Sequence, residues 1–191
     1  FQAEDGIRAF CLSRGLGDVY KRQFPYILLF AVAVMLQLFL FNNLTLSVYF
    51  NPLVYVVFLA LLPMETPPAV VLLAGLAMGV TMDWTMGAAG INTAATLPVA
   101  MMRLRLLQAI GGRENIRLGG VPSPMRLGAG NFLRYLMVLV AAQHLIFFLL
   151  ESLSWQQMGH TLLRFAVSST VAVAFVWLLA RLFTAKLSVR V

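Results

Sequence analysis

The stretch that decides the fold is residues 67–83, which read PPAVVLLAGLAMGVTMD. Its apolar run is close to the minimum length that crosses a hydrocarbon layer about 30 Å thick. The two prolines suit a first helical turn, where a missing N–H group costs nothing. Gly75 and Gly79 are four residues apart, a spacing that lets helix backbones approach closely in lipid. We therefore predict a membrane helix over 67–83 that packs closely through these two glycines.

Similar apolar stretches lie on both sides of this one. Of the 191 residues, 61% are hydrophobic and 11% are charged, whereas soluble domains are about 45–50% apolar and about 25% charged. This composition excludes an ordinary soluble domain and a disordered chain. It predicts an all-α membrane protein, a bundle of six transmembrane helices over about 24–42, 48–63, 67–83, 88–102, 132–151 and 161–183. The weakest of these, 88–102, carries several polar residues and should lie inside the bundle.

Basic residues set the predicted orientation. Nine of them lie between the fourth and fifth helices or near the end of the chain: Arg103, Arg105, Arg113, Arg117, Arg126, Arg134, Arg181, Lys186 and Arg190. With six crossings all nine lie on one side, which the positive-inside rule makes cytoplasmic. Both termini are then cytoplasmic. The Arg-rich segment could touch anionic lipid head groups or dock a cytoplasmic partner.

Residues 1–23, FQAEDGIRAFCLSRGLGDVYKRQ, differ from the rest of the chain. They contain no apolar core of a secretory signal, and they resemble the translation of a sequencing adapter. We expect this segment to be non-native, the alternative being a cytoplasmic amphiphilic tail, and we expect 24–191 to be the membrane domain. Cys11 is the one cysteine, which excludes a disulfide framework and a Cys-based zinc site.

Two polar positions inside the predicted bundle are open to a chemical interpretation. Asp83 could be a proton or cation site or a partner contact, but a solvated loop acid that helps to anchor the end of its helix is the favoured interpretation. His144, beside Gln143, could relay protons or bind a metal. A hydrogen bond between helices is favoured, because no second ligand has a suitable spacing.

Charged residues bracket the last two predicted helices. Arg134 and Glu151 are 17 residues apart, about 25 Å along a helix, so each marks a membrane boundary. Arg164 begins the next helix at the same outer boundary as Glu151, where an ion pair can form. We therefore expect the polar residues to be scattered at the boundaries instead of converging at mid-depth.

Chemical motifs are missing from the sequence. No serine has a paired base, and no Walker, Rossmann or zincin motif occurs. The Arg-rich segment lacks the interleaved aromatic residues typical of nucleic-acid binding. We expect no enzymatic activity, no catalytic, cofactor or metal site, and no nucleic-acid partner.

The order and spacing of several short stretches resemble the MreD family of rod-shape-determining membrane proteins, in its Bacteroidetes form. The resemblance covers 24–191 and rests on Asn51–Tyr55, Gly79–Asp83 with Gly90–Ala95, Pro122-Ser123, Phe132–Tyr135, Gln143-His144, Phe148–Glu151 and Thr161–Arg164. Asn92 stands where many members carry His, and Gln143 where close members often carry a second His. These two departures argue against proton or metal chemistry at these positions.

The resemblance implies a non-enzymatic scaffold in the bacterial inner membrane. Such a protein binds MreC and works with MreB, RodA and a penicillin-binding transpeptidase to place lateral peptidoglycan synthesis and maintain rod shape. The family's bundle is similar to the substrate-binding components of vitamin (ECF-type) transporters. The alternative is therefore a small-molecule-binding subunit of a membrane transporter. Its cavity could be lined only by a sparse set of residues, Asn92, Thr93, Thr96, Gln143 and His144.

Overall fold

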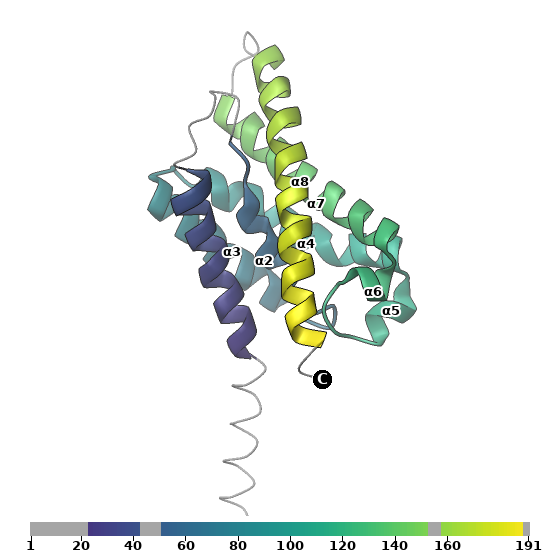
Figure 1. Cartoon of the computed structure of the whole chain (residues 1–191). Helices are drawn as coiled ribbons and strands as arrows, with labels where there is room; N and C mark the ends of the chain where they lie inside the picture. Colours follow the sequence, from purple (N-terminus) through teal and green to yellow (C-terminus); the bar gives the residue numbers. More distant parts are fainter. Residues whose placement is uncertain (1–22, 43–50, 153–157, 189–191) are drawn as a thin grey trace, which may run out of the picture.

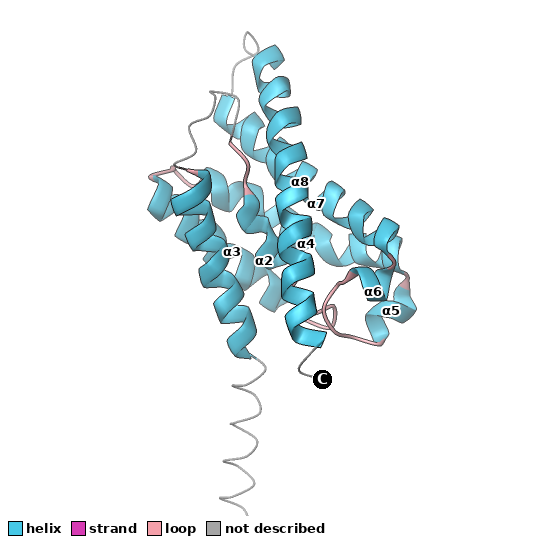
Figure 2. Cartoon of the chain, in the orientation of Figure 1, coloured by secondary structure: helices cyan, strands magenta, loops and turns pink. Residues whose placement is uncertain are grey.

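The computed structural model of the chain describes residues 23–42, 51–152 and 158–188. All regular structure in these three ranges is helical (Figure 2). The predicted adapter-derived segment lies outside the described residues, apart from Gln23. The expectation about its origin therefore stays a prediction.

Four of the described helices are long and apolar enough to cross a membrane. They are Gln23–Phe41, α3 (Pro68–Met86), α7 (Ala129–Ser152) and Gly159–Ala185 within α8 (Met158–Ser188). Each lies within a few residues of a predicted helix, because apolar composition over such a length is a local property of the sequence. The chain is thus an all-α membrane protein.

The helices alternate in direction between two ends of the molecule (Figure 1). One end, called here the arginine end, holds the start of the first helix, the end of α8, α5 (Arg113–Arg117) and α6 (Pro124–Leu127). The turn before α3 also lies there, because the Met64 N–H donates to the carbonyl oxygen of Gly120 at 2.9 Å. The opposite end holds the α3–α4 turn, the C-terminal end of α7 and the N-terminal end of α8.

The predicted second helix, 48–63, is much shorter than expected in its described part. A 3₁₀ turn, η2 (Val54–Val56), leads into α2 (Val57–Ala60), so its helical length is only about 10 Å. Every residue from Leu53 to Leu62 is at most 6% exposed. We call 51–62 the central segment. Its apolar composition fits a segment that protein encloses on all sides.

The fourth helix is longer than predicted. α4 (Ile91–Gly111) continues nine residues past the expected end at Met102 and includes Pro98. Arg103 was expected in a loop outside the bundle, but it is buried in this extension. Within the helix, the buried Arg103 side chain donates to the backbone carbonyl oxygens of Leu62, at the end of the central segment, and of Pro63, the next residue.

Candidate functional site: a buried polar cluster

Side chains from two helices bind the start of the central segment. The Gln37 side chain accepts a hydrogen bond from the Val54 N–H at 2.8 Å and donates one to the Pro52 carbonyl at 3.2 Å. His144 Nε2 of α7 accepts from the Leu53 N–H at 3.0 Å. The first N–H groups of a helix lack internal partners, and a bilayer core offers no water to replace them. Gln37 and His144 therefore act as external caps.

Two other side chains bind the end of the segment. The Tyr135 hydroxyl of α7 donates to the Ala60 carbonyl at 3.0 Å. Arg103 Nη2 of α4 donates to the carbonyl oxygens of Leu62 and Pro63. The helix in the central segment is too short to pair all of its own backbone N–H and C=O groups. Side chains of the surrounding helices bond to such groups at both of its ends.

The contacts of His144 define its protonation state. Because Nε2 accepts from a backbone amide, Nδ1 carries the proton and donates to the Val140 carbonyl at 2.9 Å. The favoured interpretation was a hydrogen bond within the bundle, and the ring makes one to the backbone of the central segment. Both ring nitrogens are occupied, so neither is available to a metal or a mobile proton.

Polar side chains meet at the middle of the bundle, contrary to the expectation that they are scattered at its boundaries. Gln143 Nε2 donates to the Tyr55 hydroxyl at 2.7 Å and to Thr96 Oγ1 at 3.0 Å. The Tyr55 hydroxyl donates to Asn92 Oδ1 at 3.1 Å. All four side chains are fully buried. The expectation was wrong because the residues come from three separate segments that only the packing brings together.

Tyr55 is the member that the sequence analysis missed. It lies in the apolar run of the central segment and contributes to hydropathy like its neighbours. A tyrosine hydroxyl that is buried usually finds a hydrogen-bond partner. A tyrosine inside an apolar run was therefore the sequence signal that could have indicated a buried polar contact.

Asp83 joins this cluster to the start of α4. Its two carboxylate oxygens accept from the backbone N–H groups of Asn92 and Thr93, each at 2.9 Å, and Oδ2 accepts from Thr93 Oγ1 at 2.5 Å. The N-cap residue, Gly90, has no side chain to do this. Asp83 thus anchors a helix end, but it lies within α3 and is half-buried, not in a solvated loop, and the end that it caps belongs to the neighbouring helix.

The two predicted packing glycines face α4. An ideal Cβ on Gly79 would lie 2.6 Å from the Thr93 Cα atom, and one on Gly75 would lie 3.0 Å from the Ala100 Cβ atom. Any side chain at Gly79 would therefore collide with backbone. The close approach brings Asp83, one helical turn beyond Gly79, to the start of α4.

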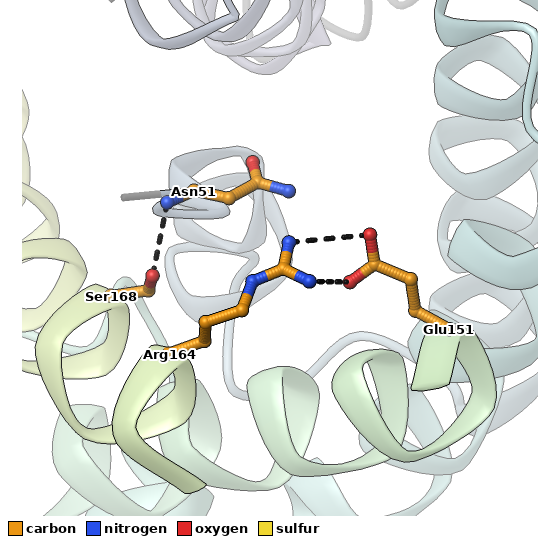
Figure 3. A network of polar contacts seen from close by, with 4 residues as sticks. All are labelled: Asn51, Glu151, Arg164 and Ser168. Atoms are coloured by element: carbon orange, nitrogen blue, oxygen red, sulfur yellow. Dashed lines mark hydrogen bonds and ion pairs between the residues drawn. The ribbon is translucent and has the colours of Figure 1, made fainter. Parts of the chain in front are cut away.

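The predicted pair at the outer boundary is present (Figure 3). Arg164 Nη1 and Nη2 lie 3.2 and 3.3 Å from the two carboxylate oxygens of Glu151. The guanidinium also stacks 5.1 Å from the centre of the Phe148 ring. Beside the pair, the Asn51 N–H donates to Ser168 Oγ at 3.0 Å. Arg134 is exposed near the start of α7, far from Glu151 at its end.

Among the described residues, no group of three or more His, Cys, Asp and Glu side chains could hold a metal ion. A comparison of the chain with protein-family models, curated proteins and solved structures found no match. The cluster itself is therefore the available guide to function. Apart from Gln143 Oε1, the polar side-chain atoms described above bond to one another and to backbone, an arrangement that holds helices together.

Proposed function

We propose that the chain is a non-enzymatic membrane scaffold of the MreD type. In this proposal it lies in the bacterial inner membrane, binds MreC and helps MreB, RodA and a penicillin-binding transpeptidase to place lateral peptidoglycan synthesis. The observation that carries the proposal is the use of the buried polar groups. His144, Asn92 and Asp83 form their hydrogen bonds with backbone groups and with neighbouring side chains. Binding of partners is then left to the outer helix surfaces.

We also propose six crossings, with both termini cytoplasmic. α4 has 21 residues, about 31 Å in length, which matches the hydrocarbon core. The central segment runs from Asn51, which contacts α8 near the outer pair, to the turn at Met64, which contacts the arginine end. Counting both as crossings places the Arg-rich segment and the C-terminus on the same side, where the positive-inside rule expects them.

The experiment is co-purification with MreC from a related rod-shaped bacterium, combined with rescue of rod shape in cells that lack MreD. One exposed apolar residue on each of the four helices that are long and apolar enough to cross a membrane is changed to Arg: Phe39, Leu73, Met137 and Leu178. We expect a change on one helix to abolish both MreC binding and rescue in a protein that still folds. His144→Ala and Asp83→Asn should weaken rescue only partly, because a scaffold distributes its binding energy.

Loss of rescue by His144→Ala with MreC binding intact would contradict the scaffold proposal. So would a complete scan in which no surface change lowers MreC binding. Either result would point to chemistry or ligand binding at mid-membrane.

One observation favours the transporter alternative. Gln143 Oε1 is buried and has no hydrogen-bond partner among the described residues, and a buried unpartnered acceptor is costly. A small polar molecule bound beside it would satisfy that atom. The test is mass spectrometry of small molecules released by denaturing the purified protein. A compound retained at one copy per chain, and lost in Gln143→Leu, would support this alternative.

A further inference from the structure

Arg103 is an unusual residue for the interior of a membrane bundle. Its side chain is 1% exposed, and no carboxylate lies within ion-pair distance in the described part of the chain. The Leu62 and Pro63 carbonyl groups accept from Nη2, but Nε has no partner there. Carbonyl dipoles offset part of the desolvation cost and carry no net charge. A buried guanidinium, which stays charged, is normally paired with an anion.

A cavity of about 250 Å³ lies beside Arg103, between the start of α3 and the second half of α4. Its lining includes Thr66, Pro68, Leu72, Met101, Arg103 and Arg105. Arg105 is exposed and adds a second cation to the lining. The start of the 19-residue α3 adds the partial positive charge of a helix N-terminus.

The surroundings of the cavity resemble the boundary between lipid and water. Met101, on its wall, is 66% exposed on the outer surface of α4. The cavity lies at the arginine end, where Arg113, Arg117 and Arg126 also gather. Glu65, the acid next to Thr66 of the lining, is turned toward Gly120 and accepts a hydrogen bond from its N–H at 3.4 Å. The site is therefore cationic on one side and apolar on the other.

We propose that this cavity binds the phosphate head group of an anionic membrane lipid. Arg105 contacts the phosphate, Arg103 adds its positive charge from beneath the cavity wall, and the apolar walls at Leu72 and Met101 contact the first part of an acyl chain. Lipid is favoured over a soluble phosphate compound because the cavity has exposed apolar walls at the end of a membrane helix pair. The proposal does not depend on MreC or on a role in rod shape.

The test uses the full chain in a neutral detergent. Phosphatidylglycerol, phosphatidylcholine and inorganic phosphate are added separately, and thermal stability and the lipid retained in native mass spectrometry are measured. We expect phosphatidylglycerol alone to stabilise the protein and to be retained. Arg105→Gln should weaken that binding about fivefold, because a basic residue near a lipid surface contributes about 1 kcal/mol. Arg117→Gln, an exposed α5 residue outside the cavity lining, is the matched control and should have little effect.

A second pair of variants keeps the test valid if Arg103→Gln does not fold. Leu72→Trp should fill the cavity and abolish phosphatidylglycerol binding without changing any charge. Leu73→Trp, on the exposed face of the same helix, should leave binding unchanged. Equal losses in Arg105→Gln and Arg117→Gln would overturn the proposal in favour of diffuse attraction. Equal stabilisation by inorganic phosphate would overturn the assignment to lipid.

Discussion

The imidazole of His144 accepts a hydrogen bond from the backbone N–H of Leu53, at a distance of 3.0 Å between Nε2 and N. The two residues are 91 positions apart in sequence. Through this bond α7 holds the start of a central segment that cannot satisfy its own backbone. Several measurable consequences follow from this bond and its neighbours.

Replacing His144 by alanine should lower the free energy of unfolding by about 1–3 kcal/mol, because the buried Leu53 N–H loses its acceptor. Thermal denaturation in detergent measures the change. Leu145→Ala is the control, since the neighbouring side chain is 41% exposed. Equal stabilities of the two variants would show that the amide finds another acceptor.

Adding a single methyl group at Gly79 should force α3 and α4 apart. Gly79→Ala is expected to cost about 1–3 kcal/mol, as overpacking usually does, and Gly79→Leu should cost more. Gly130→Ala is the control, because its Cβ atom would meet nothing within 4 Å. A Gly79→Ala protein as stable as Gly130→Ala would mean that the α3–α4 contact is looser than described.

Neutralising Asp83 should destabilise the protein more than neutralising Glu151. Asp83→Asn removes the negative charge that caps α4 and leaves one acceptor oxygen for two N–H groups, at a cost of about 1–2 kcal/mol. Glu151→Gln breaks a partly exposed pair, and such pairs contribute about 0–1 kcal/mol. Parallel thermal melts of both variants measure the difference. The reverse order would identify the outer pair as the stronger anchor.

Reporters of membrane sidedness test the proposed topology. Fusions after Val191 and at Gly112 should both report the cytoplasm, and one at Ala89 in the α3–α4 turn should report the opposite side. Gly112 and Ala89 are both exposed. An extracytoplasmic signal at Gly112 would contradict six crossings.

Polar contacts between distant segments were the part that sequence patterns predicted least well. The ion pair of Arg164 with Glu151 was expected, because both positions mark the same boundary. The bond between Tyr55 and Gln143 was not, because neither hydropathy nor spacing tells which faces of two helices meet. The burial of Arg103 was missed for the same reason. A charged residue after an apolar run indicates the end of a membrane helix, unless the groups that will bind it inside the bundle are known.

The sequence by itself determined that this chain is a helical membrane protein and where its long helices lie, since twenty apolar residues form a helix in lipid without help from any neighbour. The central segment is as apolar as those helices, yet only the tertiary structure decided that it stays short and enclosed. Its backbone groups at either end find acceptors and donors on Gln37, His144, Tyr135 and Arg103. A break in a helix at that depth is stable only where other helices bring polar side chains to it.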